Sequence, residues 1–306
     1  MSRPIRFLPD PKTLVEVSTR TLQSRLLLRP SLEINEAVVG ILGRAQRLYH
    51  MEVCAVAFVS NHYHLLLRVE SAKQLAGFMT YVNSNLAREV GRRVDWREKF
   101  WARRYRAIPV SGEEGAQRER LKYVLSQGVK EGLVERCRDW PGVHSVRALV
   151  EDEPIVGYWF DRTQEYAARR RDQDYDRLHF ATPEILVLSP LPCWEHLPPE
   201  LRRQHVVAIV QEIEREAEEE RRKSGKTPPG ASAVQERDPS ERPLRSKKSP
   251  APLFHTASRK VYRELCDSYF RFLRSFREAA ERLRAGDRSA AFPEGCFPPA
   301  LPFVGG

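Results

Sequence analysis

The order in which two periodicities alternate along the first 130 residues most constrains the fold of this 306-residue chain. Residues 12–20 (KTLVEVSTR) alternate and are rich in β-branched side chains, which predicts a strand. Apolar residues then recur at helical spacing over 34–45, after Ser31, which is a candidate N-cap. Two further apolar runs, 51–59 and 63–69, are separated by a short polar segment and predict a hairpin.

The same alternation continues beyond the hairpin. Residues 71–94 return to a helical period, 101–110 predict a strand, and 113–132 predict a helix that closes at Gly132. The order strand, helix, strand, strand, helix, strand, helix predicts an antiparallel sheet with helices packed on one face. The predicted fold class is therefore α+β, with a ferredoxin-like plan over residues 1–150.

The remaining residues predict a mostly helical C-terminal extension. Within 151–223 a helical period is clearest near the end, and 224–256 is rich in proline, serine and basic residues, which predicts a flexible linker. Over 257–306 an apolar stripe steps by three or four residues from Val261 to Leu283 and is followed by a proline-rich tail. We expect this last helix and tail to pack on the main domain.

Charge and cysteine content narrow the partners and the compartment. The net charge of +10 favours a polyanionic partner, although many basic proteins bind no nucleic acid. No apolar run approaches the roughly 18 residues that span a bilayer, so no membrane partner is expected. The N-terminus lacks the apolar stretch of an export signal, and the five scattered cysteines form no C-x-x-C pair. These features predict a reducing, cytoplasmic setting.

Two histidines stand at the start of the third predicted strand. His62 and His64 are two residues apart, so on a strand they project from the same face, while Tyr63 projects from the other. Two adjacent imidazoles form a good half-site for a divalent metal ion. The alternative is two ordinary histidines with structural roles, and a third ligand is needed to decide between these interpretations.

The predicted helix at 113–132 offers that ligand. Tyr123 and Gln127 lie four residues apart and share one helix face. Gln127 supplies an amide oxygen that could complete a metal site, and Tyr123 supplies a phenol beside it. The alternative is that Tyr123 belongs only to the apolar rim of an amphipathic helix.

These two motifs together resemble a known family. The segment NHYHLLL from Asn61, with its His-hydrophobic-His core, and YVLSQGVKEGLV from Tyr123 are similar to the motifs of single-tyrosine HUH transposases of the insertion-sequence-200 type. The REP-associated tyrosine transposase branch is the most similar. The resemblance covers roughly residues 12–145. Ser60 and Gly128 stand where the family often has proline, and neither change removes a chemical group.

The resemblance implies the HUH endonuclease fold and the cleavage and rejoining of single-stranded DNA. In that scheme His62, His64 and Gln127 hold Mg²⁺ or Mn²⁺, and Tyr123 attacks the phosphorus to leave a 5′-phosphotyrosine. Tyr63 and Tyr105 are less suitable nucleophiles. An alternative is a catalytically inactive DNA-binding module that recognises palindromic repeats, and a further one is an HUH replication initiator or relaxase.

A basic segment with interleaved aromatic residues predicts where DNA binds. Basic residues follow phosphates and aromatic rings stack on unpaired bases, so the expected partner is single-stranded or hairpin DNA. The alternative is a solvated helix end whose aromatic residues belong to the core. A homodimer is compatible with the sequence. The predicted DNA-binding residues are Arg88, Arg92, Arg93, Arg97, Lys99, Arg103, Arg104 and Arg106, with Trp96, Phe100, Trp101 and Tyr105 among them.

Overall fold

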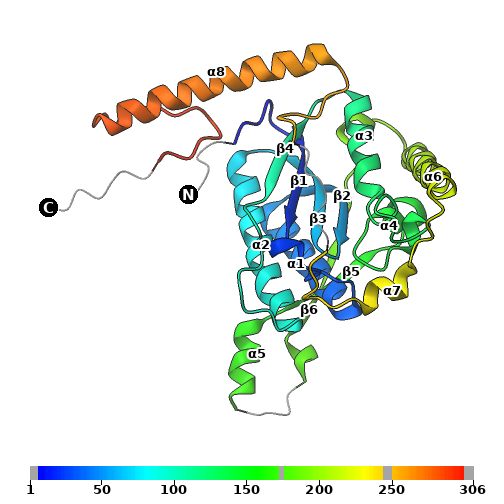
Figure 1. Ribbon diagram of the computed structural model, residues 1–306. Helices are drawn as coiled ribbons and strands as arrows, with labels where there is room; N and C mark the ends of the chain where they lie inside the picture. The colour runs from blue at the N-terminus through cyan, green and yellow to red at the C-terminus, as the bar shows by residue number, and fades with distance from the viewer. Residues whose placement is uncertain (1–5, 172–175, 244–249, 300–306) are drawn as a thin grey trace.

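The computed structural model describes residues 6–171, 176–243 and 250–299. Its central sheet has the strand order β2-β3-β1-β4, and each strand is antiparallel to its neighbours. The elements that build it are β1 (Thr13–Arg20), α1 (Leu32–Tyr49), β2 (Glu52–Val59), β3 (His62–Val69), α2 (Ala72–Arg93) and β4 (Arg106–Val110). This is the predicted ferredoxin-like plan, and the α+β class is confirmed (Figure 1).

Helices α1 and α2 pack side by side on one face of the sheet. Their apolar residues meet Val15, Val17 and Leu65, which alternate with residues on the opposite face. The hydroxyl of Ser31 accepts a hydrogen bond from the amide of Ile34, as its position before the helix predicts. Burial of this interface removes the apolar side chains of that face of the sheet from water.

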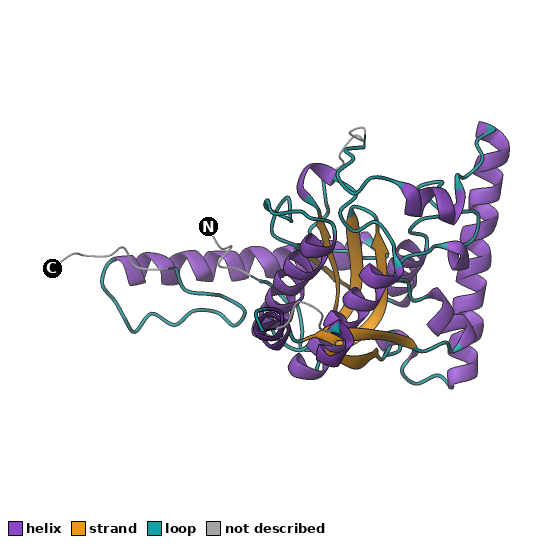
Figure 2. Ribbon diagram, turned by 90° about the horizontal axis from the view of Figure 1, so that it is seen from below, coloured by secondary structure: helices purple, strands orange, loops and turns teal. Residues whose placement is uncertain are grey.

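A second helical layer covers the other face, which the prediction of helices on one face does not include. Leu14 and Leu66 of the sheet form a core there with Val124 and Ile209. The helices involved are α3 (Glu114–Leu125), α4 (Val146–Glu151) and α6 (Pro199–Ser224). Figure 2 shows the strands enclosed between helices on both sides. The sheet is therefore the middle layer of three, and both of its faces are buried.

Helix α3 ends at Leu125, well before the Gly132 that the sequence predicts. Gly128 has a φ of 88°, a left-handed conformation that stops the helix. The side-chain amide of Gln127 donates to the carbonyl oxygen of Tyr123 at 2.9 Å, which satisfies one of the free groups at the helix end. Gln127 therefore lies in the turn that follows the helix and not on its surface.

The extension begins with an antiparallel pair of strands, which the prediction of a mostly helical region omits. β5 (Ile155–Phe160) and β6 (Ala181–Leu186) pair with each other and pack on α1. The fit is close because glycines face each other: a Cβ added at Gly40 would come within 2.1 Å of the Tyr158 backbone. A Cβ added at Gly157 would lie 2.3 Å from the carbonyl oxygen of Glu36. Helix α5 (Arg162–Arg169) lies in the connection between these two strands.

The C-terminal part contains two more helices. α7 (Gly230–Glu236) lies within the segment predicted to be a flexible linker, and the carbonyl of Gln235 accepts from the Arg29 guanidinium at 2.6 Å. α8 (Arg259–Arg284) extends away from the sheet in Figures 1 and 2. Its apolar stripe contacts Phe7 and Phe292 of the two terminal segments.

Short 3₁₀ helices occur at Leu22–Ser24, Cys137–Asp139, Arg177–Phe180 and Pro192–Trp194. The predicted linker and tail fall in part on 244–249 and 300–306, outside the described residues. Within the described residues, no helix combines the length and the apolar character needed to cross a membrane.

Candidate functional site

His62 and His64 lie at the start of β3 on the face that α3 covers. Their ring centroids are 5.2 Å apart. Tyr63 points to the opposite face, where it is fully buried against Phe58 and donates from its hydroxyl to Asn83. Strand alternation therefore brings the two imidazoles together, as the sequence predicts, and removes Tyr63 from them.

Asn61 fixes the orientation of the His62 ring. The Asn61 amide nitrogen donates to the carbonyl oxygen of Ser24 at 3.2 Å, so its Oδ1 faces the Nδ1 of His62 at 2.6 Å. His62 consequently donates from Nδ1 and keeps a lone pair on Nε2. Burial lowers the pKa of His62 well below its usual value, which favours the neutral ring that ligates metals.

That lone pair faces an oxygen atom of Gln127. Because the Gln127 amide nitrogen is engaged with the Tyr123 carbonyl, its Oε1 is directed at His62, 3.3 Å from Nε2. Two acceptors at this distance require a cation or a proton between them. Adjacent ligands of an octahedral Mg²⁺ ion, each at 2.0–2.1 Å, are separated by about 3 Å. His62 and Gln127 therefore have the spacing of two adjacent ligands of a divalent cation, and the His64 ring lies beside them, with its centroid 5.2 Å from that of His62.

A buried carboxylate contacts the Nδ1 atom of His64. The Oε1 atom of Glu16 on β1 lies 3.0 Å from the Nδ1 of His64, which leaves Nε2 of His64 as the free ring nitrogen. The Oε2 atom of Glu16 lies 2.9 Å from Nε2 of His255 and 3.4 Å from the guanidinium of Arg120. Burial opposes ionisation of Glu16, but His255 and His64 outweigh it and hold its pKa far below the usual range.

Sequence reasoning missed both Glu16 and His255. Glu16 had a usable signal, since it is the one acidic residue in β1 and stands between Val15 and Val17. An acid between two valines in a buried strand requires a partner. His255 had no such signal, because it follows a segment without periodicity and meets Glu16 only through the tertiary fold. Among the described residues no cluster of three or more His, Cys, Asp or Glu side chains is arranged to hold a metal ion.

Tyr123 lies on α3 beside this cluster. Its ring meets the His64 ring edge-on, with centroids 5.2 Å apart. The ammonium of Lys130 lies 3.4 Å from the centre of the Tyr123 ring, and the Arg120 guanidinium carbon lies 4.9 Å from it. Tyr105, by contrast, contacts Arg6 and lines no part of this cluster.

A cavity of about 750 Å³ opens next to Tyr123. One wall is α3 with the turn that follows it, and the other is the C-terminal half of α6. Lys122 and Lys130 line the first wall, and Ile213 and Ala217 line the second. The extension thus contributes one wall of the cavity beside Tyr123.

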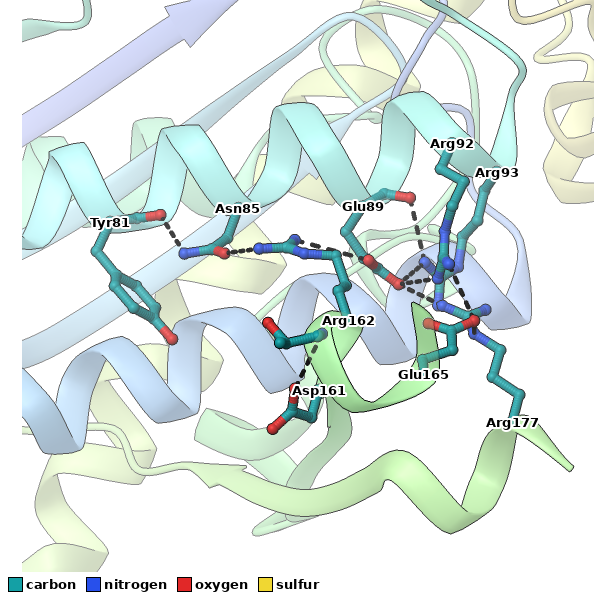
Figure 3. Close-up of polar contacts among 10 residues, drawn as sticks. Tyr81, Asn85, Glu89, Arg92, Arg93, Asp161, Arg162, Glu165 and Arg177 are labelled. Carbon is teal, nitrogen blue, oxygen red and sulfur yellow. Dashed lines mark hydrogen bonds and ion pairs between the residues drawn. The ribbon is translucent and has the colours of Figure 1, made fainter. Parts of the chain in front are cut away.

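The predicted DNA-binding residues separate into two groups. The side chains of the first group form ion pairs within the protein. Arg92 and Arg93 surround the buried carboxylate of Glu89, together with Arg177 from the segment before β6 (Figure 3). Burial opposes ionisation of Glu89, yet the charges of Arg93, Arg92 and Arg177 keep its pKa below the usual value. Arg92 also pairs with Glu165 of α5 at 2.9 Å. These arginines join α2 to the extension.

The second group is exposed. Arg88, Lys99, Arg103, Arg104 and Arg106 present their side chains to solvent, and so does Arg97, which pairs weakly with Asp95.

The aromatic residues of the same segment pack in or against the hydrophobic core. Phe100 is 4 % exposed, and the indole of Trp101 packs on Tyr63 and donates to the Asn83 carbonyl. Trp96 and Tyr105 are partly buried against the same core. The prediction that these rings stack on bases therefore lacks exposed rings at Phe100 and Trp101.

One sequence comparison finds a similarity to a known family. Residues 28–127 match the family described as "Transposase IS200 like". The resemblance to IS200-like transposases is confirmed. The IS200-like segment includes His62, His64, Tyr123 and Gln127, whereas Glu16 and His255 lie outside it. No curated protein matches the chain.

Two solved structures similar to the chain carry transposase descriptions. One is a REP-associated tyrosine transposase bound to a REP hairpin, 16% identical with a TM-score of 0.41, covering 49% of this chain and 86% of the other. The second is a candidate transposase from Deinococcus radiodurans R1, 16% identical with a TM-score of 0.29, covering 42% of this chain and 98% of the other.

Proposed function

We propose that the protein is a transposase-like DNA strand transferase that cleaves single-stranded or hairpin DNA with Tyr123 as the nucleophile. One observation carries the proposal: within the IS200-like segment, Nε2 of His62 lies 3.3 Å from Oε1 of Gln127, and the ring of His64 meets both the His62 ring and the Tyr123 ring with centroids 5.2 Å apart. A metal half-site beside a phenol is the arrangement that such a reaction needs.

In the proposed reaction the Tyr123 hydroxyl oxygen attacks the scissile phosphorus. A bond forms between Oη and phosphorus, the bond from phosphorus to the 3′ oxygen breaks, and the phenolic proton passes to water. The products are a 5′-phosphotyrosine and a 3′-hydroxyl, which takes its proton from solvent. The phosphodiester energy is retained in the covalent bond, so rejoining needs no nucleotide cofactor.

The residues around Tyr123 have separate tasks. His62, His64 and Gln127 would hold Mg²⁺ or Mn²⁺, and the bound ion would polarise a nonbridging phosphate oxygen. Lys130 places a positive charge over the Tyr123 ring, where it also attracts the phosphate.

The exposed basic residues are proposed to guide the DNA to this cluster. Arg103 and Arg106 stand just before and at the start of β4, the edge strand, and the charge of the phosphates favours binding there. Residues 1–150 are proposed to form the nuclease unit. The later segments, up to the helix and tail at 257–306, are proposed to support it.

The test is covalent capture. The full chain is incubated with Mn²⁺ and labelled hairpin oligonucleotides and analysed by denaturing electrophoresis. Wild type is expected to give a shifted, labelled band, and Tyr123→Phe, which removes only the hydroxyl, is expected to give none. Tyr105→Phe is the matched control and should form the band as wild type does.

Two outcomes point elsewhere. A band with Tyr123→Phe that vanishes with Tyr105→Phe would reassign the nucleophile. DNA binding by wild type without cleavage of any hairpin would favour the alternative, a catalytically inactive module that recognises palindromic repeats.

A further inference from the structure

The segment just before α8 adds an extra strand-like stretch to the sheet. β4 is the edge of the sheet, and its free side pairs with the backbone of His255. The His255 amide donates to the Pro109 carbonyl at 3.0 Å, and the Ser111 amide donates to the His255 carbonyl at 2.9 Å. Backbone pairing of this kind fixes the position of the residue along the edge.

Side chains anchor the segment on both sides of His255. Phe254 is 3 % exposed and meets the rings of Phe7 and Tyr269 edge-on. On the other side, the Ala257 amide donates to the Glu113 carboxylate at 2.9 Å. His255 is therefore held by the backbone, by an aromatic anchor and by a carboxylate, so its side chain has a defined direction.

That direction is towards Glu16. The side chains of His255 and Glu16 are 14% and 6% exposed, and Nε2 of His255 lies 2.9 Å from Oε2 of Glu16. The other carboxylate oxygen, Oε1, lies 3.0 Å from Nδ1 of His64. The three groups form a buried chain that ends at the His64 ring, which meets the Tyr123 ring edge-on. Oε1 of Glu16 thus contacts His64, and Oε2 contacts His255 together with the Arg120 guanidinium, which lies 3.4 Å away.

We propose that His255 is a positioning residue that acts through Glu16 on His64. Rotation of a carboxylate turns both of its oxygens together, so a contact at Oε2 restricts the oxygen that faces His64. His64 is then kept in the tautomer that leaves Nε2 free for a cation. The proposal rests on the proposed function, because it assumes that His64 is a ligand. It gives the C-terminal segment a direct part in the nuclease site.

The test measures Mn²⁺ binding to the full chain by titration calorimetry. Loss of a group that orients a ligand typically lowers metal affinity about 10-fold to 100-fold. We therefore expect His255→Ala to bind Mn²⁺ about 10-fold more weakly than wild type. His255→Gln, which keeps a donor at the position of Nε2, is expected to stay within about threefold of wild type. His179→Ala removes an exposed histidine next to β6 and serves as the matched control.

A double-mutant cycle separates positioning from general destabilisation. If His255 acts through Glu16, adding His255→Ala to Glu16→Ala should cause no further loss of affinity. Equal Mn²⁺ affinity of wild type, His255→Ala and His179→Ala would overturn the proposal while leaving the proposed function intact. Absence of Mn²⁺ binding by wild type would instead remove the proposed metal site, and this inference with it. If His255→Ala does not fold, His255→Asn, whose shorter side chain withdraws the donor from Glu16, takes its place.

Discussion

The ammonium of Lys130 lies 3.4 Å from the centre of the Tyr123 ring, although the two residues belong to different local structures. Tyr123 is on α3, and Lys130 follows the turn that Gly128 creates with its φ of 88°. The turn folds the chain back so that the charge covers the ring. A cation over an aromatic face contributes about 0.5–2 kcal/mol, depending on how far it is desolvated.

Lys130 is predicted to affect the cleavage step. Lys130→Met keeps the length of the side chain and removes its charge. We expect covalent complex formation in a single turnover to be about 10-fold slower, because the ring loses a restraint and the phosphate loses an attracting charge. Lys73→Met, on the exposed surface of α2, is the control. An unchanged rate in Lys130→Met would show that the contact is incidental.

Gln127 is predicted to contribute an oxygen ligand. Gln127→Ala removes the Oε1 atom that faces His62, so Mn²⁺ affinity measured by calorimetry should fall about 10-fold. Gln127→Glu keeps an oxygen and adds a negative charge but loses the donor to the Tyr123 carbonyl, so it should bind Mn²⁺ more tightly than Gln127→Ala. Weaker binding by Gln127→Glu than by Gln127→Ala would contradict the assignment.

The side chain of His144 is predicted to lower the free energy of unfolding in mild acid. Its burial lowers the pKa of the imidazole from 6.5 to about 4. The unfolded chain therefore binds the proton more readily, and the stability present above pH 6.5 is lost as the pH falls towards 4. The full loss for this one group is about 3 kcal/mol. His144→Gln should reduce the loss of unfolding free energy between pH 7 and pH 4, measured by urea denaturation, and an unchanged loss would contradict this assignment.

Because β5 and β6 pack closely on α1, adding one methyl group at Gly40 is predicted to destabilise the protein strongly. Gly40→Ala would place a Cβ 2.1 Å from the backbone of Tyr158, and neither backbone can yield cheaply. We expect the free energy of unfolding to fall by about 3 kcal/mol. At Gly112 an added Cβ meets nothing within 4 Å, so Gly112→Ala is the control. Equal urea midpoints for the two variants would show that β5 does not rest on α1 in solution.

The two groups of arginines should respond differently to substitution. Arg103→Ala and Arg106→Ala are expected to weaken DNA binding and to reduce the slope of log affinity against log salt by about one each. Arg93→Ala leaves part of the charge of buried Glu89 uncompensated, so it should lower the unfolding free energy by about 3 kcal/mol. Binding titrations at several salt concentrations and urea denaturation distinguish the two effects. If only Arg93→Ala changed the salt slope, Arg93 would belong to the DNA-binding group, and Arg103 and Arg106 would not.

Local patterns predicted the first half of the fold because each element there has a strong period. The Ser31 cap, the alternation of β3 and the apolar spacing of α1 and α2 are all properties of neighbouring residues. The end of α3 was placed too late because its stop signal, Gly128, lies within a sequence that otherwise continues the helical pattern. The strand pair β5–β6 was missed because its pairing is with a segment beyond α5 and its docking depends on the backbone of α1.

In the candidate site, too, some residues could be predicted from local patterns and others depend on the tertiary fold. The two histidines and Tyr123 could be predicted because strand and helix periods assign them to faces. Gln127 faces His62 for another reason, since its side chain is directed by the carbonyl that it caps. The contact of His255 with Glu16 depends on the pairing of two distant edge segments, which no local pattern encodes.

Glu16 and His255 also stand near opposite ends of the chain in the order of synthesis. A ribosome completes β3 and α3, with both site histidines and Tyr123, long before it adds residue 255. During that interval the nascent polypeptide carries the groups proposed to ligate and to attack, but it lacks the imidazole behind Glu16. Synthesis of the segment that contains His255 is therefore the last event in assembly of this polar cluster. A product terminated before residue 255 differs from the longer protein at the site itself as well as in length.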